Sequence, residues 1–115
     1  MKSADEVKPN NAPVYAAAMY PGLARICVDN GYALAVHGSL ARDFDVIAIP
    51  WVDDPSEPED VINTITEKFA VRRIGEIGHR EHGRTVYSLS VGFGDCQLDF
   101  SFMPRLTPQE EKDGD

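Results

Sequence analysis

Two apolar runs separated by a short polar turn constrain the fold of this chain more than any other feature. The first run extends from Tyr32 to Val36, and the second from Phe44 to Ile49, where Pro50 ends it. Short, nearly continuous apolar runs are typical of strands that are buried on both faces. Because the turn between the runs is short, we expect the two strands to pair antiparallel as a hairpin.

The turn and the start of the second run carry candidate functional side chains. Gly38 and Ser39 form the turn, and Asp43 and Asp45 follow it one residue apart. Residues i and i+2 of a strand point to the same face, so the two carboxylates should lie side by side. Such neighbours raise each other's pKa unless a cation lies between them, and Mg²⁺ is the cation that accepts one or two protein carboxylates. The alternative interpretation is a solvated pair that caps a turn.

Two helices are expected outside the hairpin. The first should run from about Pro21 to Asp29 after a weak turn around Val14 to Met19, because proline is unfavourable inside a helix. The second should begin at one of two capping-box patterns, at Asp54 or at Ser56. The predicted core residues are Leu23, Ile26 and Cys27 in the first helix and Val61, Ile62, Ile65 and Phe69 in the second.

Three further strands should complete the fold. They cover Val71 to Ile77, which we expect at an edge of the sheet, Arg84 to Val91, and Cys96 to Met103. In the last strand the apolar residues alternate cleanly with Gln97, Asp99 and Ser101, so these three share the polar face. The order of elements predicts an α+β fold with a mixed sheet of about five strands and two main helices packed on one face.

Size and charge exclude several classes of protein. The chain has 115 residues and a net charge of -8, which predicts one domain and argues against non-specific nucleic-acid binding. It contains no stretch of about 20 apolar residues and no signal peptide, and Cys27 and Cys96 look like reduced core residues. We therefore expect a cytoplasmic protein without a membrane segment. We expect residues 1–12 to be a flexible lead-in, 13–105 the single domain and 106–115 an acidic disordered tail.

Taken together, the polar residues resemble a known family. The pattern Gly38-Ser39, then Asp43-x-Asp45, then Asp99 on a later strand resembles the nucleotidyltransferase superfamily of the DNA polymerase β type. The smallest members of that superfamily, the minimal nucleotidyltransferases, have about this length. The string from Gly31 to Asp45 and the closing string Leu98 to Arg105 also look like small proteins of tailed bacteriophages, which would place the protein in the host cytoplasm.

The resemblance implies an activity and a role for each residue. Gly38 and Ser39 would hold a nucleoside triphosphate, and the nucleoside monophosphate would move to an unknown acceptor with release of pyrophosphate. Asp99 would help to activate the attacking hydroxyl. Two metal ions, Mg²⁺ or Mn²⁺, would stabilise the attacking and leaving oxygens. The implied metal ligands are Asp43, Asp45 and Asp99.

A second interpretation is a protein that keeps this fold without the activity. Only Leu40, Ala41 and Arg42 separate the Gly-Ser pair from the first aspartate, and no segment suggests a second domain that could hold an acceptor. A short loop offers fewer backbone amides to phosphate, although Arg42 could supply charge for nucleotide binding. The alternative is therefore an inactive interaction module, such as a phage-encoded regulator that binds a protein of a host or phage complex.

Overall fold

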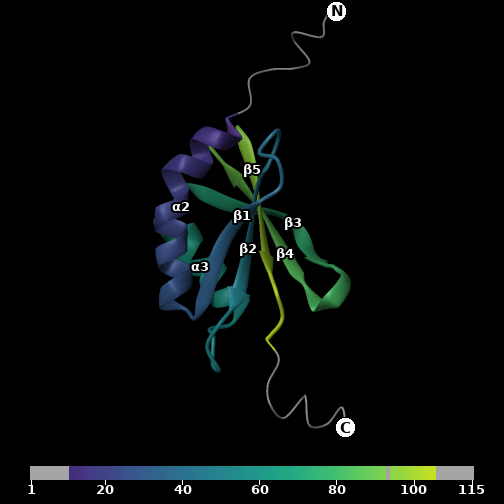
Figure 1. The fold of residues 1–115 in the computed structure, drawn as a ribbon. Helices are drawn as coiled ribbons and strands as arrows, with labels where there is room; N and C mark the ends of the chain where they lie inside the picture. The colour runs from purple at the N-terminus through teal and green to yellow at the C-terminus, as the bar shows by residue number, and fades with distance from the viewer. Residues whose placement is uncertain (1–10, 93, 106–115) are drawn as a thin grey trace, which may run out of the picture.

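The chain folds into a mixed sheet with helices on one face (Figure 1), in a computed structural model that describes residues 11–92 and 94–105. The fold class predicted from the sequence is therefore confirmed. Most of the expected lead-in and the whole expected acidic tail lie outside the described residues. In order, the elements are α2 (Ala12–Asp29), β1 (Tyr32–His37), β2 (Phe44–Pro50), α3 (Pro58–Lys68), β3 (Val71–His79), the short 3-10 helix η1 (Glu81–Gly83), β4 (Thr85–Val91) and β5 (Cys96–Phe102).

The sheet has five strands in the order β1-β2-β5-β4-β3. β1 and β2 form the predicted antiparallel hairpin, and β3 is the predicted edge strand. β5 lies between β2 and β4, parallel to β2 and antiparallel to β4. The last strand of the fold therefore lies directly beside the hairpin.

Helix α2 differs from its prediction. It is one continuous helix that contains Pro21, so the predicted turn between Val14 and Met19 is wrong. A proline inside a helix removes one backbone hydrogen bond. Here that loss is offset by burial along the face that carries Met19, Leu23 and Cys27.

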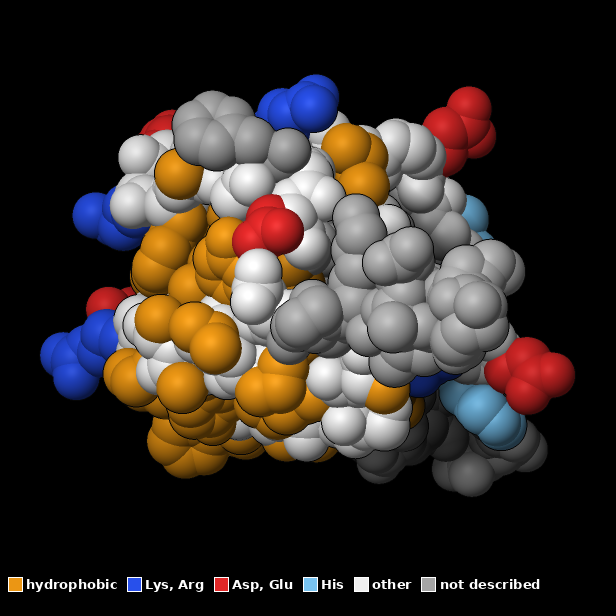
Figure 2. Space-filling view, turned by 90° about the horizontal axis from the view of Figure 1, so that it is seen from above, with side chains coloured by type: hydrophobic (Ala, Val, Ile, Leu, Met, Phe, Trp, Pro, Cys, Tyr) orange, Lys and Arg blue, Asp and Glu red, His pale blue; other side chains and the backbone are white. Residues whose placement is uncertain are grey.

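The outer face of α2 is also apolar. Val14 is 65% exposed and Val28 is 49% exposed, and hydrophobic side chains gather on the α2 side of the molecule in Figure 2. A helix with apolar residues on both faces lacks the clear 3.6-residue period by which amphipathic helices are recognised. None of the described helices is long and apolar enough to span a membrane.

Helix α3 begins without either predicted capping box. Its first residue is Pro58, and the preceding residue, Glu57, makes no side-chain capping bond. The backbone of Ser56 makes other hydrogen bonds. Its N–H donates to the carbonyl of Asn30, and its carbonyl accepts a hydrogen bond from the Tyr32 hydroxyl at 2.6 Å. Proline in the first turn needs no hydrogen bond for its nitrogen, so the helix starts without a cap.

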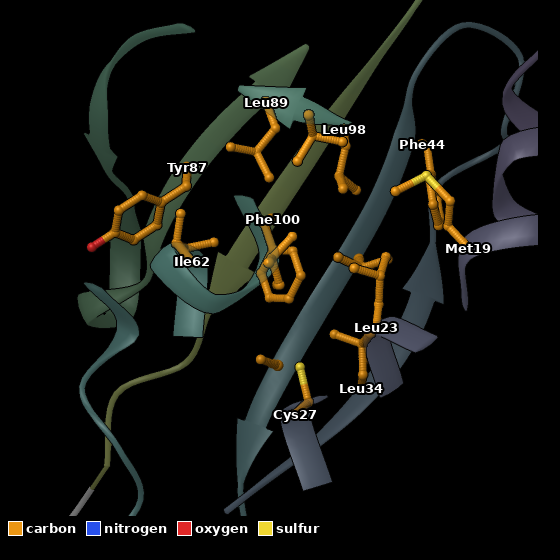
Figure 3. Close-up of a cluster of buried hydrophobic side chains, with 14 of the residues drawn as sticks. Met19, Leu23, Cys27, Leu34, Phe44, Ile62, Tyr87, Leu89, Leu98 and Phe100 are labelled. Atoms are coloured by element: carbon orange, nitrogen blue, oxygen red, sulfur yellow. The ribbon is translucent and has the colours of Figure 1, made fainter. Parts of the chain in front are cut away.

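The core lies between the helices and one face of the sheet (Figure 3). Phe44, Leu98 and Phe100 are fully buried there, and both cysteines are buried as expected. Burial of β1 and β2 on both faces is not observed, because Ala33 and Ala35 of β1 and Ile49 of β2 are exposed. The helices cover one face only, and β1 is an edge strand. The predicted core residues are buried, apart from Phe69, which is half-buried just after α3. 

Candidate functional site

Two of the three predicted aspartates lie opposite each other on the face of the sheet away from the helices. Asp45 of β2 and Asp99 of β5 are direct partners in the parallel register. Their chain neighbours Phe44 and Phe100 point into the core, so the two carboxylates share the other face. We call Asp45 and Asp99 the acid pair.

The acid pair belongs to a row of residues that crosses the whole sheet. His37 of β1 pairs with Asp45, and Ser88 of β4 pairs with Asp99. Ser88 in turn pairs with Ile74 of β3. Successive members of such a row are separated by about 4.8 Å, the spacing between strands. The row therefore connects the turn after β1 to the opposite edge strand.

The two carboxylates of the acid pair repel each other. Burial, the charge of Asp99 and a hydrogen bond with Asp99 together raise the pKa of Asp45, while the nearby His37 opposes that rise. One oxygen of Asp99, Oδ1, accepts hydrogen bonds from Gln97 Nε2 at 2.8 Å and from Ser88 Oγ at 3.3 Å. These neutral donors hold Asp99 in place without neutralising it. Two carboxylates in this arrangement would favour a cation between them.

Asp43, the first residue of the Asp-x-Asp motif, is placed differently from Asp45. It lies half-buried in the bend before β2, not in the strand. Its charge makes the smallest of the contributions that raise the pKa of Asp45. Within residues 11–92 and 94–105, no three His, Cys, Asp or Glu side chains are grouped so that they could hold a metal ion. The predicted trio is therefore an acid pair with a third carboxylate nearby.

The Gly-Ser loop, residues 38–43, begins against the acid pair. Gly38 has a φ of +77°, and a Cβ on this residue would lie 2.6 Å from Asp45 Oδ2. Both the backbone conformation and the close approach therefore require glycine here. The Ser39 hydroxyl oxygen accepts a hydrogen bond from the Ala41 backbone N–H at 3.1 Å, and Arg42 is exposed in the same loop.

The donor set of the acid pair fits Mg²⁺. The ion prefers oxygen ligands, needs only one or two protein carboxylates, and completes its coordination with water and substrate phosphates. Asp45 and Asp99 supply such carboxylates on an exposed sheet face, and Asp43 adds negative charge nearby. A cation between them would relieve the repulsion that raises the pKa of Asp45.

Three residues at the site were not given a role from the sequence. Gln97 and Ser88 hold Asp99, and His37 lies opposite Asp45. The alternation of the last strand did place Gln97 on the same face as Asp99. The strand pairing that brings Ser88 and His37 into the row depends on register, which the sequence pattern does not specify.

The pH dependence of stability should reveal the repulsion within the acid pair. Because the pKa of Asp45 is raised on folding, its contribution to stability is fully present below the unfolded pKa of about 3.9 and is lost as the pH rises through the folded pKa. Asp45→Asn removes the repulsion. Since opposed like charges cost a few tenths of a kcal/mol to about 1 kcal/mol, we expect its melting temperature at pH 7 to rise by about 2–4 °C.

Thermal unfolding between pH 3 and pH 8, without divalent ions, measures this effect. The advantage of Asp45→Asn should vanish near pH 3. Asp53→Asn changes an exposed carboxylate outside the site and serves as the matched control. A lower melting temperature for Asp45→Asn at pH 7 would contradict the electrostatic account.

Comparison with known protein families and with curated proteins identifies no relationship. No protein-family model matches the chain, and no curated protein is significantly similar to it in sequence. The function proposed below is therefore supported by the residues and geometry of the site.

Proposed function

We propose that this protein is a Mg²⁺-dependent nucleotidyltransferase that moves a nucleoside monophosphate from a nucleoside triphosphate to a hydroxyl group. The observation that carries the proposal is the direct pairing of Asp45 with Asp99 on neighbouring parallel strands, next to Gly38. Residues far apart in the chain thereby form one carboxylate site beside a glycine turn. This combination is what the sequence resemblance requires.

The parts of the site suit the parts of the reaction. Backbone N–H groups of the Gly-Ser loop and the charge of Arg42 would bind the triphosphate. Asp43 and Asp45 would hold the Mg²⁺ that is bound to the triphosphate, with Asp99 beside it, and the ion would supply positive charge to the phosphate oxygens. Asp99, oriented by Gln97 and Ser88, would accept the proton of the attacking hydroxyl.

A purely structural role for the acid pair is less consistent with its position. Carboxylates that cap turns are solvated and lie at the ends of elements. Asp99 instead lies in the middle of β5, half-buried, and Asp45 carries a raised pKa. An arrangement of this kind costs stability, and such sites are concentrated where function requires them.

Ligand-dependent stabilisation tests the proposal. The full chain is heated with Mg²⁺ or Mn²⁺ and each of the four ribonucleoside triphosphates in turn. A ligand at 100 times its Kd stabilises the folded state by about 2.7 kcal/mol, which is a shift of roughly 10 °C or more for a domain of this size. We expect this shift for at least one nucleotide, and we expect Asp43→Asn and Asp45→Asn to abolish it.

Asp53→Asn should retain the ligand-dependent shift, since its carboxylate is exposed and outside the site. The comparison uses the shift caused by the ligand, so the intrinsic stability of each variant does not enter. If no nucleotide shifts the wild-type melting temperature, the proposal fails and the alternative of an interaction module gains support.

A further inference from the structure

A pocket lies at the other end of the row that contains the acid pair. It has a volume of about 370 Å³ and is lined by residues 73–77 of β3 and by Tyr87 and Ser88 of β4. We call it the β3 pocket. Its volume is within the range of pockets that bind small molecules.

Ser88 contacts both the β3 pocket and the acid pair. It lines the pocket, and its hydroxyl donates to Asp99 Oδ1 at 3.3 Å. Ile74, another lining residue, is the direct strand partner of Ser88. The pocket therefore begins about one strand spacing, roughly 5 Å, from the strand that carries Asp99. The Gly-Ser loop lies on the opposite side of the acid pair.

A bulge in β3 accounts for the pocket. The register moves from the pair Ile74 and Ser88 to the pair Gly78 and Val86, so residues 75–77 lie opposite Tyr87 alone. Gly75 has a φ of +67°, and a Cβ on it would meet no atom within 4 Å. Bulges of this kind bend an edge strand away from its neighbour and are frequent next to active sites.

The strand β3 is anchored on its helix-facing side. Arg73 Nη2 lies 2.7 Å from Glu59 Oε2 and 2.8 Å from Asn63 Oδ1, and its guanidinium lies 5.3 Å from the centre of the Tyr87 ring. The Tyr87 hydroxyl also donates to Glu59 at 3.1 Å. These contacts lie on the helix face of the sheet and anchor β3 to α3. Ile74 and Ser88 share the opposite face with the acid pair and form the part of the pocket nearest Asp99.

The charges around the pocket indicate what it can accept. The charge of Arg73 is offset by Glu59, whose pKa is lowered mainly by its hydrogen bond with Arg73. Glu76 is exposed in the lining, and the acid pair lies beyond Ser88. Ile74 and Ile77 add apolar surface. The lining is thus partly apolar, its arginine is ion-paired and its carboxylate is exposed, which favours a ligand with an apolar body and a positive charge.

Building on the proposed function, we infer that the β3 pocket binds the acceptor, and that this acceptor is a small alcohol with an apolar body and a positive charge. Its hydroxyl would lie at the end of the pocket formed by Ser88, next to Asp99. The hydroxyl oxygen forms a bond to the α-phosphorus as the bond from that phosphorus to the bridging oxygen breaks. Pyrophosphate leaves, and the hydroxyl proton passes to Asp99 and then to water.

Three hydroxyl-bearing probes that differ in charge test the inference. Tyramine, 4-ethylphenol and 4-hydroxyphenylacetate share a phenol ring and carry a positive, zero and negative charge. Each is titrated into the full chain while the backbone amide resonances are followed by NMR. We expect saturable shifts at residues 74–77 and Ser88, with a Kd for tyramine on the order of 1 mM.

The affinity of the pocket for the three probes should depend on the charge of the probe. Tyramine should bind at least about threefold more tightly than 4-hydroxyphenylacetate, since single exposed charge pairs have effects of this size. Glu76→Gln should reduce the ratio toward one. Glu67→Gln, which removes an exposed carboxylate of α3 outside the pocket lining, should leave it unchanged.

The inference is overturned if no probe causes saturable shifts at these residues, or if the three probes bind equally. The titration contains neither metal nor nucleotide, so its failure leaves the proposed function untouched. Conversely, charge-dependent binding of tyramine in a protein that no nucleotide stabilises would support the pocket and reject nucleotidyl transfer.

Discussion

Asp99→Asn is expected to lower the rate of nucleotidyl transfer by about 10²- to 10⁴-fold, the usual contribution of a general base. Asparagine has nearly the same shape and can still accept the hydrogen bonds from Gln97 Nε2 and Ser88 Oγ. It cannot accept a proton at neutral pH. The rate is measured as pyrophosphate released from each nucleoside triphosphate with Mg²⁺, using the phenol hydroxyl of tyramine as the probe acceptor.

Nucleotide binding should survive this substitution. Asp45 and the Gly-Ser loop are unchanged, so the ligand-dependent rise in melting temperature should persist in Asp99→Asn. The neutral side chain also removes one cause of the raised pKa of Asp45. Asp53→Asn is again the control and should transfer at the wild-type rate. Equal loss of nucleotide binding and transfer in Asp99→Asn would show that Asp99 acts mainly in binding and would contradict its role as proton acceptor.

Much of this fold is predictable because its strands have clear local sequence patterns. The clean alternation in the last strand identified Asp99 as a polar residue on a core-forming strand. β5 has that pattern from Cys96 to Phe100, whereas Ser101, which we expected on the polar face, is buried. The short turn at Gly38 predicted the hairpin, and β3 is the expected edge strand. These features depend on neighbouring residues and on period two, which sequence patterns record well.

The features that the sequence did not reveal depend on contacts between distant segments. Pro21 stays inside α2 because the helix gains more from burying Leu23 and Cys27 than it loses at the proline. Ser56 does not cap α3 because Asn30 and Tyr32 bind its backbone. Local propensity is overruled in both cases by tertiary packing.

In the site, too, local patterns were predictable and contacts between distant segments were not. The alternation and the motif spacing identified Asp45 and Asp99, but only the strand order makes them partners. The bulge that forms the β3 pocket has no clear signal beyond Gly75 within a strand pattern. A glycine at that position predicts a bulge at most, and says nothing of the pocket or of its distance from the acid pair.

Gly38→Ala is expected to abolish nucleotide binding, and a second glycine in the chain provides a matched control. A left-handed alanine costs about 1–2 kcal/mol, so Gly38→Ala and Gly75→Ala should lose similar stability, given their φ values of +77° and +67°. The two positions differ in what the new Cβ meets. At position 38 it would lie 2.6 Å from Asp45 Oδ2, whereas at position 75 no atom lies within 4 Å.

The Asp45 carboxylate must therefore move in Gly38→Ala, which changes the geometry of the acid pair. Thermal unfolding should show a similar loss of stability for both variants without ligand. The shift caused by Mg²⁺ and nucleotide should disappear in Gly38→Ala and persist in Gly75→Ala, because the β3 pocket is not needed for nucleotide binding. If Gly38→Ala retained the shift, the close approach of the turn to the acid pair would have no part in binding, and the triphosphate would have to lie elsewhere on the sheet.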